Sequence, residues 1–238
     1  MSAPDRPFAG QTAVVTGATS GIGAAIARAL TDHGAMVYAL GRRAGGEAGA
    51  GLAWHRVDLD EDAEIAAFAA VLAQEVEGLD ILIHGAGLYN TGPVATTPVA
   101  ALDRQWRINL RAPYLLTQQL LPLIRRRKGQ IVFVNSSVWA NARADVVAYA
   151  ASKYALKALA DGLRAEINPK GLRVLSLFPG RTATPMQAEI FALEGVPYRP
   201  ETLLQPEDIA TTLVAALALP RTAEITDLHI RPARKPKP

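Results

Sequence analysis

Short apolar runs alternate with segments of helical periodicity along almost the whole chain. Strand-like runs stand at 12–18, 36–41, 52–59, 79–87, 129–137, 172–180 and 224–232. Apolar residues with helical spacing occupy 21–35, 60–78, about 98–127, 148–171 and 206–220. The strand runs are continuously apolar, as in parallel strands that helices cover on both faces. The alternation predicts a doubly wound α/β fold with a seven-stranded, mostly parallel sheet and helices on both of its faces.

One domain is expected to span residues 1–238. Half of the 238 residues are hydrophobic, which is enough for one sizeable core. No internal repeat or linker is visible, and the Gly/Ala-rich stretch 44–52 is too short to separate two domains. Residues 1–9 and 233–238 are expected to be flexible tails, and the ending "RPARKPKP" from Arg231 onward reads as a solvated segment.

The composition disfavours several classes of protein. Cys is absent, which excludes disulfides and thiolate metal sites and suits a reducing cytoplasm, and no metal site is expected. The first ten residues carry no apolar core of a signal peptide, and no apolar run reaches the roughly 18 residues of a membrane span. The net charge is only +3, and the densest basic run, 125–128, ends a helical segment, where cations suit the helix dipole. A nucleic-acid partner is therefore not expected.

A glycine-rich turn, "TGATSGIG" at 16–23, joins the first strand run to the first helical segment. Gly17, Gly21 and Gly23 let the backbone turn tightly and approach a ligand closely. The N–H groups at the start of the following helix suit a pyrophosphate. The spacing G-x-x-x-G-x-G differs from the G-x-G-x-x-G of many dinucleotide folds, and a purely structural turn would also use glycines. The position after the first strand of an alternating chain favours nucleotide binding.

Tyr149 and Lys153 stand four residues apart in "YAASK", one helical turn apart on the same face. Such a pair can be an ordinary feature of a helix surface, or it can place an ammonium near a phenol that exchanges a proton. The polar strand ends 83–87, 134–137 and 177–180 should open on the side of the glycine turn, since ligands of open parallel sheets bind at the carboxyl ends of strands. These groups are therefore expected to converge on one crevice.

Five motifs, in order, resemble those of the short-chain dehydrogenase/reductase family, over about residues 10–232. The turn "TGATSGIG" resembles its nucleotide-binding turn, and "HGAG" at 84–87 stands where the family usually has N-N-A-G. "RIN" places Asn109 where the family keeps a catalytic Asn, "YAASK" resembles its Tyr/Lys pair, and "PGRTATPM" at 179–186 resembles its segment over the nicotinamide. The resemblance implies a Rossmann fold and an oxidoreductase that interconverts a carbonyl and a secondary alcohol with a nicotinamide cofactor.

The resemblance also implies the site residues. Ser136 stands 13 residues before Tyr149 and 7 after Gly129, the family's usual spacings for the catalytic serine, and the reverse assignment to Ser137 stays open. The catalytic group implied is Asn109, Ser136, Tyr149 and Lys153. Cofactor contacts are expected from Asn109, Tyr149 and Lys153 and from the turns around them, namely Gly17, Thr19, Ser20, Gly21, Ile22, Gly23, Arg42, Arg43, Asp58, Leu59, Gly85, Ala86, Gly87, Pro179, Gly180, Thr182 and Thr184.

By the same resemblance, Tyr149 exchanges the substrate proton, and Ser136 orients and polarises the substrate oxygen. A free phenol has a pKa of about 10. Lys153, together with the nicotinamide charge in the oxidised complex, is therefore expected to lower the pKa of Tyr149, and Lys153 is also expected to hold the ribose hydroxyls beside the nicotinamide. Asn109 is expected to interrupt its helix and to support a water relay to Lys153.

The end of the second strand run, "ALGRR", favours NADP over NAD. NAD-preferring members of the family usually have an acid where this chain has Gly41, and a carboxylate would repel a 2′-phosphate that a guanidinium can bind. Arg42, and less directly Arg43, are expected beside the adenosine, although a solvated Arg pair is an alternative. Asp58 is expected at the adenine edge, and the short interval from Arg42 to Asp58 implies that the helix usually found there is cut to a turn or lost.

His84 and Gly85 replace two asparagines that are usual in the family. His84 is interpreted as structural, because the Tyr/Lys pair already supplies the acid and base. Gly85 is expected to loosen the floor of the cofactor site, because it removes a side chain that ties neighbouring strands.

The substrate is expected to be a small or medium-sized carbonyl compound or secondary alcohol. Residues 185–205 correspond to the family's variable lid. Arg143 and Arg181 could meet an anionic group, or they could be ordinary solvated arginines. The candidates for an apolar substrate wall are Tyr89, Val138, Trp139, Phe191 and Tyr198.

The long helical segment "ALDRQWRINLRAPYLLTQQLLPLI" is apolar on more than one face. With the resemblance, this predicts a homo-oligomer, a tetramer before a dimer. Two rival functions stay open on the same fold: a non-catalytic NADP(H)-binding regulator, which usually lacks the Tyr or Lys, and an isomerase or epimerase, which is usually longer.

Overall fold

A computed structural model describes residues 6–43 and 49–234 of the chain. Its centre is a seven-stranded sheet in the order β3-β2-β1-β4-β5-β6-β7. Every neighbouring pair of strands is parallel, which confirms the predicted doubly wound α/β class. The strands are β1 (Thr12–Thr16), β2 (Met36–Gly41), β3 (Leu52–Arg56), β4 (Ile81–His84), β5 (Gln130–Val134), β6 (Arg173–Pro179) and β7 (Asp227–Ile230).

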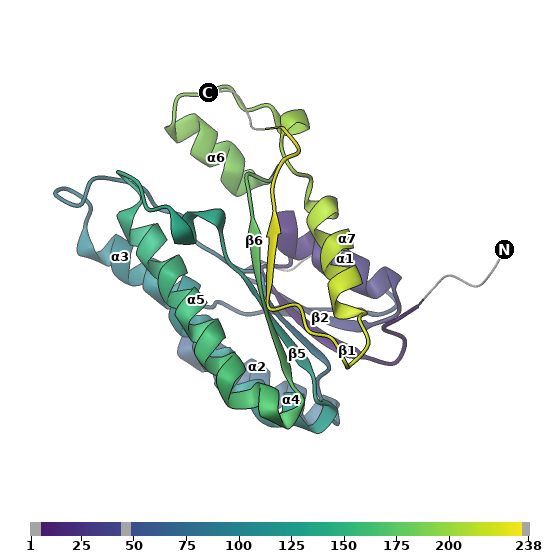
Figure 1. The fold of residues 1–238 in the computed structure, drawn as a ribbon. Helices are drawn as coiled ribbons and strands as arrows, with labels where there is room; N and C mark the ends of the chain where they lie inside the picture. The colour runs from purple at the N-terminus through teal and green to yellow at the C-terminus, as the bar shows by residue number, and fades with distance from the viewer. Residues whose placement is uncertain (1–5, 44–48, 235–238) are drawn as a thin grey trace.

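Helices cover both faces of this sheet (Figure 1). One face carries α1 (Gly21–Asp32) and α7 (Pro206–Leu217), and the other carries α2 (Asp62–Glu75), α4 (Ala112–Arg127) and α5 (Val147–Ile167). A π-helical segment, Arg107–Arg111, joins α3 (Val99–Trp106) to α4. In Figure 1, α6 (Pro185–Leu193) stands beyond the carboxyl end of β6. Among the described residues, no helix has both the length and the apolar character that a membrane crossing requires.

Two apolar cores lie on the two faces of the sheet. Alternate residues of one strand serve opposite cores: Val15 packs with Leu30 of α1, while its neighbour Val14 packs with Leu120 of α4. The strand therefore needs an apolar side chain at each of these positions, which is why the strand runs in the sequence are continuously apolar.

The strand order reverses beside β1, because β2 and β3 lie on one side of it and β4 to β7 on the other. The connections leave β1 and β4 in opposite directions at their carboxyl ends, so a crevice opens between them. This is the edge at which the glycine turn and the polar strand ends meet.

The connection between β2 and β3 is short. Part of the predicted loss of a helix falls on residues 44–48, which lie outside the described residues. From Gly49 the chain forms a bridge to Leu52 and enters β3 at once, without a helix in the described part of this connection. Leu52, Trp54 and His55 of β3 are only half-buried, as expected for a sheet edge with less cover.

The prediction of a flexible tail at residues 1–9 is wrong for the residues nearest β1. Phe8 is 1% exposed and belongs to the core beneath α1, and its N–H donates to the carbonyl oxygen of His33. A single buried aromatic side chain is enough to anchor this segment, and composition alone did not reveal it. At the other end, residues 235–238 of the expected tail lie outside the described residues.

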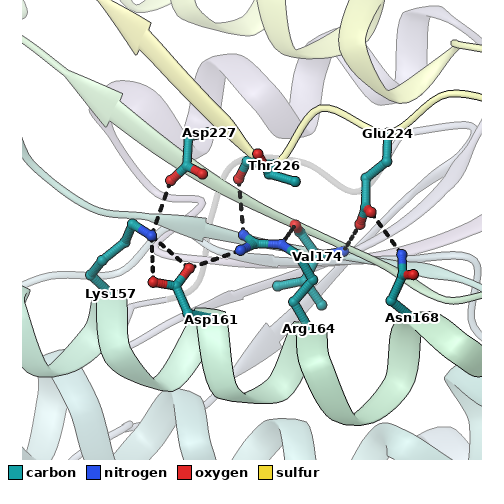
Figure 2. Close-up of polar contacts among 8 residues, drawn as sticks. All are labelled: Lys157, Asp161, Arg164, Asn168, Val174, Glu224, Thr226 and Asp227. Atoms are coloured by element: carbon teal, nitrogen blue, oxygen red, sulfur yellow. Dashed lines mark hydrogen bonds and ion pairs between the residues drawn. The ribbon is translucent and has the colours of Figure 1, made fainter.

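A polar cluster fastens the carboxyl half of α5 to β6 and β7 (Figure 2). Arg164 donates to the carbonyl oxygens of Val174 and Thr226, and Lys157 pairs with Asp227 at 3.3 Å. Glu224 accepts from the N–H of Val174 and from the side-chain amide of Asn168. These contacts hold α5 against the sheet, and α5 carries Tyr149 and Lys153.

Candidate active site

A cavity of about 840 Å³ opens at the carboxyl ends of the strands. It extends from the glycine turn after β1, past the end of β4, to α5 and α6. Ser136, Tyr149 and Lys153 line it, as does every predicted cofactor contact except Asn109. The structure therefore brings together groups that lie up to 167 residues apart in the sequence, from Gly17 to Thr184. Among the described residues, no cluster of His, Asp or Glu side chains is arranged to hold a metal ion.

The glycine turn passes directly against the backbone that follows β4. Gly17 has a φ of +68°, and a Cβ atom there would lie 2.7 Å from the Cα atom of Ala86. A side chain at this position would therefore meet backbone that has no room to move. The first turn of α1, from Gly21 to Gly23, lines the cavity, and its N–H groups have no acceptor within the helix. This end of the cavity is suited to an anionic group such as a pyrophosphate.

Tyr149, Ser136 and Lys153 meet at the inner wall of the cavity. Tyr149 and Lys153 lie in α5 and are 8% and 3% exposed. The Ser136 hydroxyl lies beside the Tyr149 side chain and acts to lower the pKa of that phenol, which supports the assignment of Ser136 rather than Ser137. The Lys153 ammonium donates to the carbonyl oxygen of Val134 at 3.0 Å and lies 5.8 Å from the centre of the Tyr149 ring.

Burial sets the protonation of Tyr149 and Lys153 in the chain itself. Burial raises the pKa of Tyr149 to about 12, and the nearby Ser136 hydroxyl opposes this shift only in part. Burial also lowers the pKa of Lys153 to about 8. Both side chains lie where water is excluded, so both favour their neutral forms. Near neutral pH the chain by itself holds Tyr149 as a proton donor.

Asn135 ties the end of β5 to α5, a role that no sequence pattern indicated. Its Oδ1 accepts from the N–H of Ser136 at 2.9 Å, and its Nδ2 donates to the carbonyl oxygen of Lys153 at 3.1 Å. The side chain is 4% exposed. One amide thus links the backbones of two predicted catalytic residues.

Asn109 lies in the π-helical segment before α4, so the helix is interrupted at the predicted position. Its side chain does not line the cavity. The Oδ1 atom accepts from the N–H of Leu88 at 2.7 Å, while Nδ2 donates to the carbonyl oxygen of Leu88 and to the Ser152 hydroxyl. The described contacts therefore show Asn109 fastening the loop after β4 to α5.

His84 has a structural role in this arrangement, as predicted. It is 2% exposed, stacks on Phe133 with ring centres 4.8 Å apart, and hydrogen-bonds through Nε2 to the Thr117 hydroxyl at 2.8 Å. Burial lowers its pKa to about 3, so the ring stays neutral near pH 7.

The expectation that Gly85 loosens the floor of the site is not supported by its contacts. The hydroxyl of Thr16 accepts from the N–H groups of Gly85 and Ala86, at 3.0 and 3.1 Å, and so ties β1 to the end of β4. A Cβ atom on Gly85 would lie 2.7 Å from the carbonyl oxygen of Thr16. Here the close approach of the two backbones replaces the bond that a side chain would otherwise make.

Arg42 and Arg43 lie at the far end of the cavity, after β2, and both are exposed. Asp58 and Leu59 line the same end from the loop after β3. The carboxylate of Asp58 accepts from the N–H of Asp60 at 3.0 Å, which orients it.

The substrate end differs in part from the predicted apolar wall. Tyr89 and Val138 line the cavity, and the Tyr89 ring meets the Tyr149 ring edge-on with centres 5.0 Å apart. Trp139 instead packs on Phe178 and Tyr154, away from the lining. The other two candidates, Phe191 and Tyr198, pack on each other outside the described lining. Sequence spacing cannot decide which way a loop side chain points.

Several lining residues were not anticipated. Arg231 and Pro232 were interpreted as the start of a solvated tail, but the chain after β7 bends over Gly180, and Pro232 lies beside it. No sequence pattern marked this bend. The other unanticipated residues include Arg104, Ile108, Asn141, Gln187 and Ile190.

Comparison with known proteins agrees with this geometry. Residues 11–195 match the family model described as short chain dehydrogenase. The chain belongs to the short chain dehydrogenase family. It is an oxidoreductase of that family, since the match includes the glycine turn, Ser136 and the Tyr149/Lys153 pair.

Members of the short chain dehydrogenase family from different organisms resemble the chain over nearly its full length. An uncharacterized short-chain type dehydrogenase/reductase, y4eK of Sinorhizobium fredii, is 32% identical over 231 residues, which cover 93% of this chain and 91% of that protein. Glycine betaine reductase ATRR of Emericella nidulans is 29% identical over 98% of this chain, and the chain matches only 19% of that longer protein. A crystal structure of a metagenomic short-chain oxidoreductase in complex with NADP has a TM-score of 0.81 and 31% identity, covering 96% of this chain and 100% of that one.

Proposed function

We propose that the chain is an NADP(H)-dependent oxidoreductase that interconverts a carbonyl compound and a secondary alcohol. The observation that carries this proposal is the convergence of the Tyr149 and Ser136 side chains beside a buried Lys153, in a cavity that continues to the glycine turn. The pair offers two hydroxyl groups to one substrate oxygen. The rest of the cavity runs past the glycine turn to Arg42, where a dinucleotide would lie. When bound, the nicotinamide would supply or accept the hydride.

The residues around the cavity fit a nicotinamide dinucleotide. The turn at Gly17 and the first turn of α1 would hold the pyrophosphate, and Lys153 would hold the nearby ribose hydroxyls. NADP is favoured over NAD at the adenosine end. A Cβ atom on Gly41 would lie 2.4 Å from Cγ2 of Thr19, so an acid at this position would need Thr19 to move. Arg42 is exposed beside it and available to a 2′-phosphate.

In this proposal Tyr149 is the proton donor and Ser136 the orienting group. Because burial keeps the pKa of Tyr149 at about 12, the phenol remains protonated over the whole physiological range of pH. Ser136 would hold the carbonyl oxygen within reach of the Tyr149 hydroxyl, and the developing negative charge on that oxygen would take the Tyr149 proton. This protonation state suits carbonyl reduction better than alcohol oxidation.

The test is NADPH oxidation with a panel of ketones and aldehydes, followed for the wild type and Tyr149→Phe. Loss of the proton donor should lower kcat by at least about 100-fold, the scale of general acid catalysis, while NADPH binding measured by fluorescence titration changes little. Tyr154→Phe is the matched control, because Tyr154 follows on the same helix, is 44% exposed and lies outside the cavity lining. A Tyr149→Phe variant that keeps more than a tenth of wild-type turnover would overturn the assignment.

The two rival functions predict different results. A non-catalytic regulator would bind NADPH and turn over no carbonyl compound. An isomerase or epimerase would convert its substrate with tightly held cofactor and no net change in NADPH absorbance. The presence of both Tyr149 and Lys153 at the cavity wall favours the oxidoreductase over the regulator.

We also propose that the chain forms a homo-oligomer through the helices that carry the site, most simply a tetramer, with a dimer as the alternative. Large apolar side chains are exposed on these helices: Val99 on α3, Tyr114 on α4, and Val147 and Tyr154 on α5 are 44% to 70% exposed. Exposed apolar groups on neighbouring helices are typical of subunit contacts. The absence of Cys supports action in a reducing cytoplasm.

A further inference from the structure

Two arginine side chains at the substrate end of the cavity share one carboxylate. Arg143 lies in the loop that leads from β5 to α5, and Arg181 follows β6; both line the cavity. Glu194 ends α6. Its Oε1 atom accepts from Nη2 of Arg143 and from Nη2 of Arg181, each at 2.9 Å, and its Oε2 atom accepts from Nη2 of Arg181 at 2.7 Å.

This cluster of Arg143, Glu194 and Arg181 carries a net positive charge of one. Glu194 does not line the cavity, whereas both arginines do. The one acid in the described lining is Asp58, which lies at the adenosine end beyond β3. The substrate end therefore presents cationic groups to the cavity without a lining carboxylate.

The Arg181 guanidinium is held in place from two directions. Its central carbon lies 4.6 Å from the centre of the Phe191 ring, and Phe191 is 5% exposed. The Arg181 side chain is itself 31% exposed and the Glu194 side chain 24%, so water screens this group less than it would a fully exposed pair. An oriented guanidinium loses little entropy when it binds a second anion.

Both arginines keep donors for a second anion. A guanidinium has five N–H donors, and Glu194 receives hydrogen bonds only from the Nη2 atoms. Glu194 is also poorly placed by its own helix, because a carboxylate at the C-terminus of a helix faces the negative end of the helix dipole. Its bonds to the two arginines offset this disadvantage.

We propose that the carbonyl substrate carries a carboxylate, which binds Arg143 and Arg181 while Ser136 and Tyr149 hold the carbonyl oxygen. Glu194 occupies part of the same guanidinium surface and so weakens the binding of that carboxylate. This inference rests on the proposed function, and it specifies oxo acids, rather than neutral ketones, as the substrate class.

The experiment compares oxo acids with their methyl esters, each pair having the same ketone and the same spacing to the carboxyl group. At saturating NADPH, kcat/KM for the acid should exceed that for its ester by at least about 10-fold for the best pair, as expected for one hydrogen bond to a charged group. Arg143→Gln and Arg181→Gln should each lower the acid-to-ester ratio by about 10-fold. Glu194→Gln should raise the ratio, because it releases both guanidiniums.

The control variant is Arg28→Gln, since Arg28 is exposed on α1 and lies outside the cavity lining. It should leave the ratio and both kcat/KM values unchanged. NADPH binding and a thermal melt show whether each variant is folded, and Arg143→Gln is the safer variant because the Arg143 side chain is 53% exposed.

The outcomes separate this inference from the proposed function. Esters that react as well as their acids in the wild type, or a ratio that stays the same in both arginine variants, would overturn the carboxylate subsite and leave carbonyl reduction standing. If neither member of any pair is reduced while a neutral ketone is, the subsite is again wrong. If no carbonyl compound of any kind is reduced, the proposed function fails and the subsite fails with it.

Discussion

The side-chain amide of Asn135 donates to the backbone carbonyl oxygen of Lys153 at 3.1 Å. Through its Oδ1 atom the same side chain accepts from the N–H of Ser136. The backbones of Ser136 and Lys153 are therefore held at a set separation by the one buried side chain of Asn135. Through these two bonds Asn135 acts as a positioning residue.

Replacing Asn135 with Ala should reduce kcat by about 10-fold, a loss comparable to that of one well-placed hydrogen bond. The KM for NADPH should change little, because the nucleotide turn lies elsewhere. Asn135→Ser, which supplies a hydroxyl in place of the amide, should have a kcat between those of the wild type and Asn135→Ala. Steady-state kinetics measure the split between kcat and KM, and urea unfolding measures the accompanying loss of stability. Wild-type turnover in Asn135→Ala would show that the amide bridge does not position the site.

Ser136→Ala should lower kcat strongly, by about 10- to 100-fold, because it removes the hydroxyl beside Tyr149 that is proposed to orient the carbonyl. Ser137→Ala should have a smaller effect, although Ser137 also lines the cavity. The two variants are matched in size and lie side by side in the sequence. Turnover of one ketone by both variants shows which serine matters more. A larger loss of kcat in Ser137→Ala would move the catalytic assignment to Ser137.

The pH dependence of carbonyl reduction should follow Lys153 rather than Tyr149. Burial lowers the pKa of Lys153 to about 8, so its charge is lost as the pH rises through that value, while Tyr149, with a pKa of about 12, stays protonated. If the charge of Lys153 holds the cofactor, kcat/KM for NADPH should decline above about pH 8. Lys153→Arg should move the decline to higher pH, because a guanidinium keeps its charge. A flat profile for the wild type to pH 9.5 would contradict this.

The lowered pKa of Lys153 also makes the stability of the fold depend on pH. Between a pKa of about 8 in the folded chain and 10.5 in the unfolded chain, the unfolded state binds more protons at Lys153. The contribution of Lys153 to the free energy of unfolding therefore rises with pH across that window. Tyr149 acts in the opposite direction only above about pH 10, where the unfolded phenol ionises first. Denaturant unfolding of the wild type and Lys153→Met at pH 7.5 and pH 9.5 measures how the contribution of Lys153 to the free energy of unfolding changes between these two pH values.

Arg42→Ala should raise the KM for NADPH by about 10- to 100-fold and leave the KM for NADH almost unchanged. One hydrogen bond from a guanidinium to the 2′-phosphate contributes about 1.5–3 kcal/mol, which corresponds to that factor. Arg43→Ala should have a smaller effect of the same sign. Because Arg42 is exposed, added salt should weaken the preference. Equal kcat/KM for NADH and NADPH in the wild type would show that Arg42 and Arg43 do not bind the 2′-phosphate and are ordinary solvated side chains.

The oligomer can be tested by light scattering at micromolar concentration, which should give two to four times the mass of one chain. Tyr114→Glu and Tyr154→Glu place charges on the exposed apolar surface of α4 and α5 and should shift the protein toward the monomer. A monomeric wild type would refute the proposal. Met36→Glu is the matched control, because Met36 is an exposed apolar residue at the start of β2.

The sequence was informative wherever neighbouring residues determine a local structure. Continuous apolar runs predicted the parallel strands, and glycines at 17, 21 and 23 predicted the nucleotide turn. The spacing of four residues placed Tyr149 and Lys153 on one helical face. Counting from Tyr149 by the family's usual spacing chose Ser136, whose hydroxyl lies beside the Tyr149 side chain. For the glycine turn and the Tyr149/Lys153 pair, the backbone geometry of one turn or one helix is enough to relate the residues. The choice of Ser136 rested on the family resemblance.

The rest depended on contacts between segments far apart in the chain. The burial of Phe8 under α1, the link from Thr16 to Gly85 and the bend of Arg231 over the cavity each join residues that no local pattern relates. Which of the five candidates form the substrate wall was likewise decided by the direction of loop side chains. Two of the five, Tyr89 and Val138, line it.

By itself, then, the sequence determined the α/β alternation, the glycine turn and the candidate chemistry of Tyr149, Lys153 and Ser136. Only the tertiary structure decided the protonation of that group and the pairing of Arg143 and Arg181 with Glu194. The physical reason is that a pKa depends on how completely surrounding segments exclude water, and a shared carboxylate depends on where three separate loops meet. Neither the pKa nor the shared carboxylate follows from residue spacing, because both arise only when the sheet and its helices pack together.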